Sequence, residues 1–286
     1  MGRAAIVTDS TADLEPAVAA AAGLRIVPLH VRFGDQEFLD GIDMSPAEFW
    51  RRLLEPGAAF PTTAAPSPGS FIEAFEACFA EGADAVVCAT IGSGLSGTFQ
   101  SATIAAGMLP GREIHVIDTG TTSMGTGIAA LLASELAGTG MPAADIAASV
   151  RGRLADIDLY VALDTLEYLR RNGRLSAARA AIGTVLSIKP IITVREGIVV
   201  LAEKPRTRSK SRERAAELIT AAPLDRVAIL HTPTSTDEEV ALFRDRIIAL
   251  APGGIDPGRV STGLIGPSTG PHLGPGMIGA VFLRRR

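Results

Sequence analysis

The sequence predicts an α/β protein of two domains, a Rossmann-like N-terminal domain on a parallel sheet (1–156) and a C-terminal α/β domain (157–286). Three observations lead to this prediction. The chain of 286 residues is longer than a typical single domain. Apolar residues make up 47% and charged residues 20%, the balance of a globular protein with a large core. Short apolar runs alternate with helical patterns, as a helix-covered parallel sheet requires.

In the first half, helix-start signals separate the apolar runs. Ser10–Asp13 offers a capping hydroxyl, and Asp13 and Glu15 suit the positive end of a helix dipole. Ser45–Glu48 is a capping-box pattern with proline in the first turn. Prolines on both sides of 61–68 force extended backbone, so we expect a loop lying against another segment. The expected strands are Ala4–Val7, Ile26–Phe33, Asp84–Thr90 and Glu113–Asp118, and the expected helices 46–54, 69–80, 98–108, 123–136 and 143–154.

After about residue 154 the pattern changes, and strands become more frequent. Arg195–Glu196 lies between two β-rich runs and predicts a hairpin turn. Pro267–Gly276 is so rich in glycine and proline that we expect a loop. The expected strands are Asp158–Leu163, Pro190–Val194, Gly197–Leu201, Arg226–His231, Arg259–Leu264 and Met277–Leu283, and the expected helices 177–187, one that ends near 220, and 237–249.

Composition argues against several classes of function. The chain has 27 basic and 31 acidic residues, hence a net charge of -4, and only 5% aromatic residues, so nucleic-acid binding is not expected. No signal-peptide core and no apolar run of membrane-spanning length is found, so we expect a cytoplasmic protein with Cys78 and Cys88 reduced. The four histidines lack the spacing of metal ligands, and no metal or cofactor is expected.

The strongest local signal is the Ser/Thr/Gly-rich stretch 91–102, between an expected strand and an expected helix. Ligands of open α/β sheets bind at such carboxyl ends of strands. Glycine lets backbone N–H groups turn inward, and Ser93, Ser96 and Thr98 add hydroxyl donors. No lysine follows, so a nucleotide phosphate loop does not fit, and a small anion such as a carboxylate fits better. A tight turn with a helix cap explains the stretch equally well.

A serine hydrolase is the alternative function. Gly94–Thr98 nearly forms the G-x-S-x-G nucleophile motif, with Thr98 at the last glycine position. Ser96 would be the nucleophile and His272, on its Gly/Pro-rich loop, the base, although no acid stands out as the partner of His272. A third possibility is a small-molecule sensor whose ligand is not a lipid.

Seven motifs then follow one another along the chain: Asp9–Leu14, Pro61–Ser67, Gly94–Thr98, Asp118–Gly127, Leu166–Arg174, Glu203–Arg208 and Gly266–Gly276. In this order they resemble the DegV family of bacterial fatty-acid-binding proteins over essentially the whole chain. The resemblance implies that a long-chain fatty acid binds between the two domains. It also implies that Thr63, Ser96, the Gly97 backbone and His272 hold the carboxylate, and Ser93 is a further candidate. Ala64 and Ala65 replace the Ser-Gln of the family motif beside Thr63.

The resemblance also implies a partner. In that family the bound acid is presented to a separate ATP-dependent fatty acid kinase, which forms an acyl phosphate for phospholipid synthesis. Since this chain has no nucleotide-binding motif, we expect a non-catalytic carrier subunit. The basic run from Arg206 to Arg214 has two possible roles. It is either a solvent-exposed face, or a docking surface in which Arg206 and Arg208 contact the kinase or, transiently, an anionic membrane. The apolar stretch Ala177–Ile192 is either a tunnel wall or a core helix.

Overall fold

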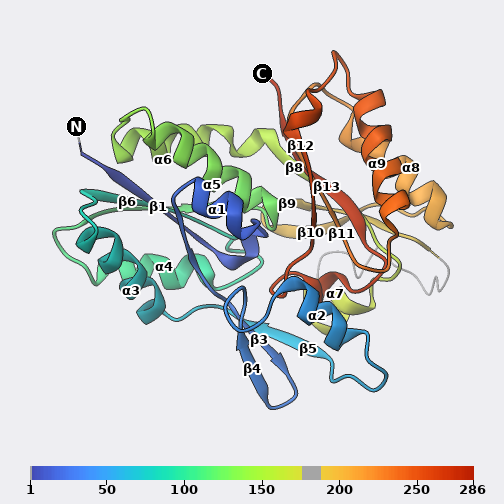
Figure 1. The fold of residues 1–286 in the computed structure, drawn as a ribbon, viewed down its shortest axis with the longest axis horizontal. Helices are drawn as coiled ribbons and strands as arrows, with labels where there is room; N and C mark the ends of the chain where they lie inside the picture. Colours follow the sequence, from blue (N-terminus) through green and yellow to red (C-terminus); the bar gives the residue numbers. More distant parts are fainter. Residues whose placement is uncertain (1, 176–187) are drawn as a thin grey trace.

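The computed structural model describes residues 2–175 and 188–286. Its N-terminal sheet has four parallel strands in the order β2-β1-β6-β7 (Figure 1). The order places β1 in the middle of the sheet, where ligand sites of parallel sheets open at the carboxyl ends. The predicted parallel N-terminal sheet is therefore confirmed. Its strands are β1 (Ala4–Asp9), β2 (Leu24–Val27), β6 (Ala85–Thr90) and β7 (Glu113–Asp118).

Helices cover both faces of this sheet (Figure 1). Strand β6 is buried along its whole length because its side chains alternate between two cores. Val86 and Cys88 pack with α3 and α4, whereas Val87 and Ala89 pack with α5 and α6. Burial on both faces explains why the strand is apolar throughout. The helices are α3 (Pro68–Ala80), α4 (Thr98–Gly107), α5 (Met124–Ala137) and α6 (Ala143–Arg153).

The C-terminal sheet is mixed, with the order β10-β9-β8-β13-β11-β12. Strands β11 and β12 run parallel, and the other neighbouring pairs run antiparallel. On β13, Ala280 and Phe282 pack against α8 and α9, while Val281 and Leu283 turn toward the N-terminal half. The elements are β8 (Ile157–Ala162), β9 (Ile191–Arg195), β10 (Ile198–Glu203), β11 (Leu224–His231), β12 (Val260–Leu264), β13 (Ile278–Arg284), α8 (Arg208–Ile219) and α9 (Asp237–Leu250).

A small third sheet, β4-β3-β5, lies beside α2 (Pro46–Leu53) at the bottom of Figure 1. It corrects two expectations. The expected strand 26–33 is two strands in different sheets, because Pro28 lacks the N–H that would continue the ladder. The expected loop at 61–68 begins with a strand that pairs with β3, Thr63 opposite Val31. The strands are β3 (His30–Phe33), β4 (Gln36–Leu39) and β5 (Pro61–Ala64).

Two more local expectations are wrong. Ser10–Ala12 forms a single 3-10 turn, η1, capped by Asp9, and helix α1 begins later as Pro16–Ala21. Asp13 has a positive φ of 49°, which ends the turn. The expected loop at 267–276 contains the short helix α10 (Gly270–Leu273), which carries His272. Helix α7 (Glu167–Arg171) precedes Arg174.

Two expectations about the second half of the chain are not tested by the structure. The expected helix 177–187 lies outside the described residues. The domain boundary at 156 stays a prediction, although the chain passes from one main sheet to the other between β7 and β8. The terminal arginines hold the end of β13 in place, since Arg284 pairs with Asp158 at 2.9 Å and Arg286 with Asp156 at 2.5 Å.

Candidate functional site

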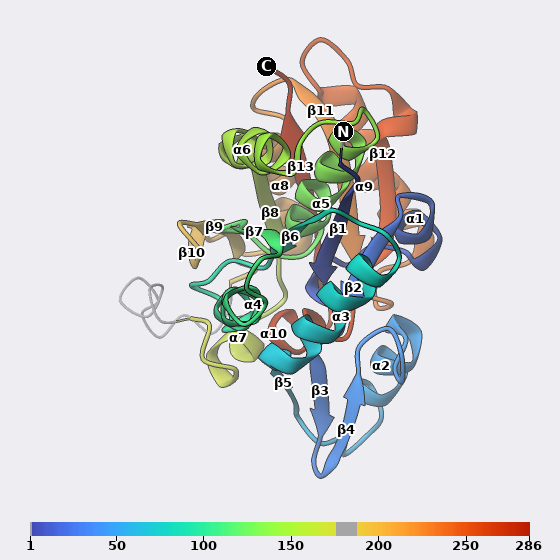
Figure 2. The same ribbon diagram turned by 90° about the vertical axis from the view of Figure 1, so that its left-hand side faces the viewer.

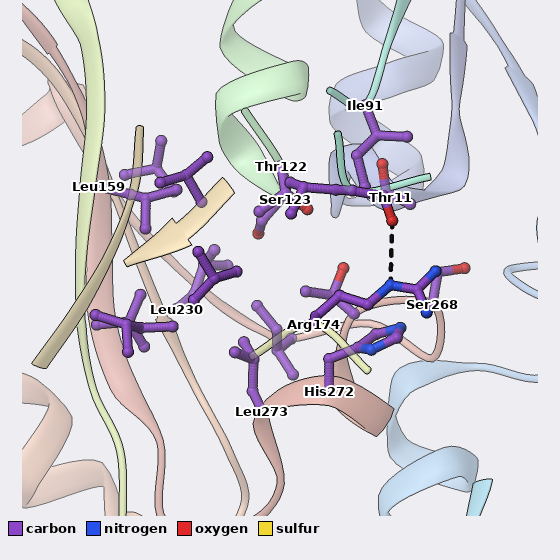
Figure 3. A pocket seen from close by; sticks show the side chains of 18 of the residues that line it. Thr11, Ile91, Thr122, Ser123, Leu159, Arg174, Leu230, Ser268, His272 and Leu273 are labelled. Carbon is purple, nitrogen blue, oxygen red and sulfur yellow. Dashed lines mark hydrogen bonds between the residues drawn. The ribbon is translucent and has the colours of Figure 1, made fainter. Parts of the chain in front are cut away.

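A cavity lies between the carboxyl edge of the N-terminal sheet and one face of the C-terminal sheet. Residues of the segments after β1, β6 and β7 form its N-terminal side, among them Thr11, Ile91 and Thr122 (Figure 3). Because parallel strands end at one edge, segments more than a hundred residues apart in sequence meet there. The expectation that ligand-binding residues gather at this edge agrees with the position of the cavity.

The opposite wall is apolar. It is made by strands of the C-terminal sheet and by Leu169 and Leu273 from the two short helices α7 and α10. Leu159 and Leu230 lie at the end of the cavity away from His272 (Figure 3). The strand residues of this wall are Leu159, Val161, Ile192, Val194, Val199, Leu230, Gly279, Ala280 and Val281. Such a surface can cover a hydrocarbon chain but offers no side-chain hydrogen bond along its length.

Polar side chains gather at the other end of the cavity, where Thr63, Ser96, His272 and Arg174 line it. The Thr63 hydroxyl lies 3.1 Å from His272 Nε2, within hydrogen-bonding distance. The Ser96 hydroxyl lies 2.8 Å from the Thr98 hydroxyl, and the Arg174 Nε donates to the Leu95 carbonyl at 3.2 Å. Strand β5, the loop after β6 and helix α10 therefore bring three predicted site residues together.

His272 is neutral in this environment. Burial, with a smaller contribution from the Arg174 guanidinium, lowers the pKa of His272 to about 4. Its Nδ1 is buried and has no hydrogen-bond partner in the described part of the chain. Since a buried polar atom without a partner is costly, Nδ1 is available to a ligand. A neutral imidazole can donate one N–H to a carboxylate while its other nitrogen accepts from the Thr63 hydroxyl.

The loop 91–97 differs from the expected anion nest. Its Gly92 N–H donates to the Thr121 carbonyl at 2.8 Å, and its Ser93 N–H to Asp118 Oδ1 at 3.0 Å. The Leu95 and Ser96 N–H groups donate to the Gly92 carbonyl. These four donors are used within the protein, so they do not form a nest for a ligand.

Two of the predicted residues lie apart from the cavity. Ser93 and Gly97 are exposed and are not among the residues that line it. Gly94 allows the backbone of this loop to approach another backbone segment closely. A Cβ on Gly94 would lie 2.5 Å from the Gly197 carbonyl oxygen of the β9–β10 turn. The loop thereby packs its backbone directly against the C-terminal half.

The geometry required of a serine hydrolase is not found among the described residues. Ser96 bonds to Thr98, and the His272 nitrogen that would accept its proton faces Thr63 instead. No carboxylate lies within hydrogen-bonding distance of His272 Nδ1 in the described ranges. A base without its orienting acid gives no support to the hydrolase.

The sequence prediction missed several lining residues. Arg174 belongs to the Leu166–Arg174 motif, and Thr122 and Ser123 belong to the glycine-spaced motif after β7, so both signals were present without an assigned role. Thr11 and Ser268 also line the cavity, and they belong to the Asp9–Leu14 and Gly266–Gly276 motifs, in which they had no assigned role.

The two predicted docking residues, Arg206 and Arg208, differ in their contacts. Arg208 forms an ion pair with Asp164, as does Lys189 at 3.1 Å. Arg206 is exposed. Further along α8, Arg212 pairs with Glu239 and Arg214 with Glu203 and Glu217, so most of the basic run is ion-paired.

Two kinds of feature are absent from residues 2–175 and 188–286. No group of three or more His, Cys, Asp or Glu side chains there is arranged to hold a metal ion. Nor does that part of the chain contain a helix of the length and apolar character needed to cross a membrane.

Comparison with known proteins identifies the family. A family model described as "Uncharacterised protein, DegV family" matches residues 3–285. A DegV domain-containing protein of Streptomyces coelicolor is 34% identical over 98% of each chain. A fatty-acid-binding DegV family protein from Thermus thermophilus, 34% identical, has a TM-score of 0.87 over 99% of this chain and 100% of its own. DegV of Bacillus subtilis, solved as a fatty acid binding protein, is 29% identical, with a TM-score of 0.88 over the whole of both chains. The chain belongs to the DegV family.

Proposed function

We propose that this protein binds one long-chain fatty acid, with its carboxylate at Thr63, Ser96 and His272 and its acyl chain along the apolar wall. The observation that carries the proposal is a cavity with an apolar wall on the side of the C-terminal sheet and converging hydroxyl and imidazole groups at one end. The solved relatives from Thermus thermophilus and Bacillus subtilis, described as fatty-acid-binding, share the fold over the full chain. The exposed Gly97 backbone and Ser93 are assigned no contact in this proposal.

The energetics favour a division of work between tail and head group. Each buried methylene contributes about 0.8 kcal/mol, so a chain of ~14 methylenes contributes on the order of 10 kcal/mol before the cost of association. The head group then needs orientation more than affinity. Neutral donors suffice for this, and the nearby Arg174 guanidinium balances the charge of the carboxylate.

Native mass spectrometry of protein purified from bacteria tests the proposal. A co-purified species with the mass of a fatty acid, displaced by added oleate, is the expected result. An empty protein that cleaves activated esters would support the serine hydrolase, and a co-purified species that is not a lipid would support a small-molecule sensor. Either result would refute the proposal.

We infer further that the protein is a carrier subunit that presents the carboxylate to a separate ATP-dependent fatty acid kinase in the cytoplasm, for phospholipid synthesis. The support is the position of the polar end beside α7, which carries exposed basic residues close to Arg174. In this proposal Arg206 and Arg208 contact the kinase or, transiently, anionic membrane. The ion pair of Arg208 with Asp164 leaves the exposed Arg206 as the better residue to test.

A further inference from the structure

His272 comes from the C-terminal half of the sequence, but the segment that carries it is attached to the N-terminal half. We call residues 265–273, which lead from β12 into α10, the His272 segment. The Trp50 Nε1 of α2 donates to the Ile265 carbonyl at 2.9 Å. Gly270 packs so closely on α2 that an added Cβ would lie 2.5 Å from the Phe49 ring. Figure 2 shows α10 beside α7 and above β3 and β5.

Two carboxyl groups of the N-terminal half bind the backbone of the His272 segment. Asp13 Oδ1 accepts from the Gly266 N–H at 2.9 Å, and its Oδ2 accepts from the Ser123 hydroxyl at 2.5 Å. Asp40, which is buried, accepts from the Ser268 N–H at 3.2 Å and from the Ser268 hydroxyl. Gly266 has no room for a side chain, since a Cβ would lie 2.5 Å from Asp13 Oδ1. The carboxyl groups of Asp13 and Asp40 therefore hold the segment at two nearby positions, Gly266 and Ser268.

Among the described residues, the groups that hydrogen-bond to these two carboxyls or shift their pKa most include no cation. Asp13 and Asp40 face each other, and Asp9 faces Asp40. Glu15 lines the groove beside them. On the side of β11 and β12, Arg226 and Arg259 line the adjoining groove, but each is paired elsewhere, with Glu135 and Asp225 respectively. The remaining neighbours of the two carboxyls are hydroxyl and backbone N–H groups of Ser10, Ser123, Gly266, Ser268 and Thr269.

The charge state of this attachment changes between mildly acidic and neutral pH. Burial raises the pKa of Asp13 to about 7, and the repulsion of Asp40 adds to it. Burial likewise raises the pKa of Asp40 to about 6. A carboxyl whose pKa is raised in the folded state stabilises that state at acidic pH, and the contribution is lost as the pH rises through the folded-state value. The hydrogen bonds from Gly266 and Ser268 act in the opposite direction because they favour the ionised carboxylates, but burial is the larger effect on each pKa. Ionisation therefore favours exposure of the two carboxyls to water, and with it release of the segment.

We propose that Asp13 and Asp40 are positioning residues that hold the His272 segment in place for the fatty-acid carboxylate, and that their hold weakens as the pH rises from about 5.5 to 8. The role assigned to His272 rests on the proposed function, whereas the attachment of the segment does not. The segment also contacts the C-terminal half, since Asn172 Nδ2 donates to the Pro271 carbonyl at 2.6 Å and α10 packs against α7. Both halves therefore hold the head-group end, and the C-terminal sheet contributes the wall for the acyl chain.

Hydrogen–deuterium exchange on the ligand-free protein tests the attachment by itself. After correction for the intrinsic pH dependence of exchange, protection of the amides at 266–273 should fall about tenfold or more between pH 5.5 and 8. Asp13→Asn and Asp40→Asn keep the shape and an acceptor oxygen but cannot ionise, so each should reduce this pH response. The matched control is Asp35→Asn, which makes the same charge change at an exposed position of the β3–β4 turn and should leave the response unchanged.

Ser268→Ala provides a second variant that leaves the charges intact. It removes the hydroxyl donor to Asp40, so protection should be lower at both pH values while the pH response remains. Two results would overturn the proposal. One is amide protection in the wild type that does not depend on pH, and the other is a pH response that is the same in the wild type and in both Asn variants.

Oleate affinity, measured at the same pH values, tests the consequence for binding. Ionisation of oleate itself is common to all variants, so the comparison is the ratio of wild-type to variant affinity. The Asn variants should gain about three- to tenfold relative to the wild type at pH 8 and little at pH 5.5. A ratio that stays constant with pH refutes the positioning role. Failure of the wild type to bind oleate at all refutes the proposed function instead, and the exchange experiment still decides on the attachment.

Discussion

The hydrogen bond between Thr63 and His272 allows a quantitative test of the carboxylate site. We consider Thr63→Val, which keeps the shape of the side chain, and His272→Phe, which keeps a ring. The 3.1 Å contact means that each change removes a donor and also leaves the other partner without its hydrogen bond. A hydrogen bond to a charged group contributes about 1.5–3 kcal/mol, so each single variant should bind oleate about 10- to 150-fold more weakly.

The double variant sharpens this prediction. Because both residues act through one hydrogen-bonded unit, their effects should not add, and the double variant should bind better than the sum predicts by about 0.5–3 kcal/mol. Titration calorimetry with oleate below its micelle concentration measures all four proteins. Thr62→Val is the matched control, since Thr62 is the exposed neighbour on β5 and faces the other side of the strand. Additive effects, or single variants with wild-type affinity, would show that the carboxylate is held elsewhere.

Three further predictions follow from the structure. For Arg206→Ala, oleate affinity should be unchanged while phosphorylation of bound oleate by a fatty acid kinase falls, and loss of oleate binding would contradict a docking role. Because the pKa of His272 is lowered to about 4, the free energy of unfolding of the wild type should fall by about 1–3 kcal/mol as the pH drops from about 6.5 toward 4. His272→Gln should remove this fall, and urea unfolding at several pH values measures it. Gly94→Ala should cost about 1–3 kcal/mol and weaken oleate binding, because its Cβ would collide with the Gly197 carbonyl, whereas Gly107→Ala, in open space, should cost little in the same assays.

The main-sheet strands were predicted correctly where an apolar run is bounded by turn or helix-start residues on both sides. Glu113–Asp118 is a strand with the predicted bounds, and the hairpin around Arg195–Glu196 is present. The strand predicted at 26–33 failed because β2 and β3 are contiguous in apolar character but belong to two sheets. The local signal was Pro28, which cannot donate to a ladder inside a strand, but the sequence does not tell which sheet the chain joins after it.

The candidate site was predicted in part. Thr63, Ser96 and His272 line one cavity, and that they hold a fatty-acid carboxylate stays a prediction. The anion nest was wrong because the same glycine-rich pattern serves a different purpose, the close approach of Gly94 to Gly197. A glycine that frees an N–H for a ligand and a glycine that makes room for another backbone look alike in one sequence.

The sequence by itself predicted most strands of the two main sheets, the family of the chain and three residues of the polar end of the site, Thr63, Ser96 and His272. Those properties depend on the periodicity of apolar side chains, on helix caps and on short sequence motifs, all of which involve residues close together in the sequence. Tertiary structure alone decided that the His272 segment is attached to the N-terminal half, and that Asp13 and Asp40 attach it. Asp13 and Gly266 are 253 positions apart, and the pKa of a carboxyl depends on what surrounds it in space. The charges that position the site thus become visible only when the chain is folded.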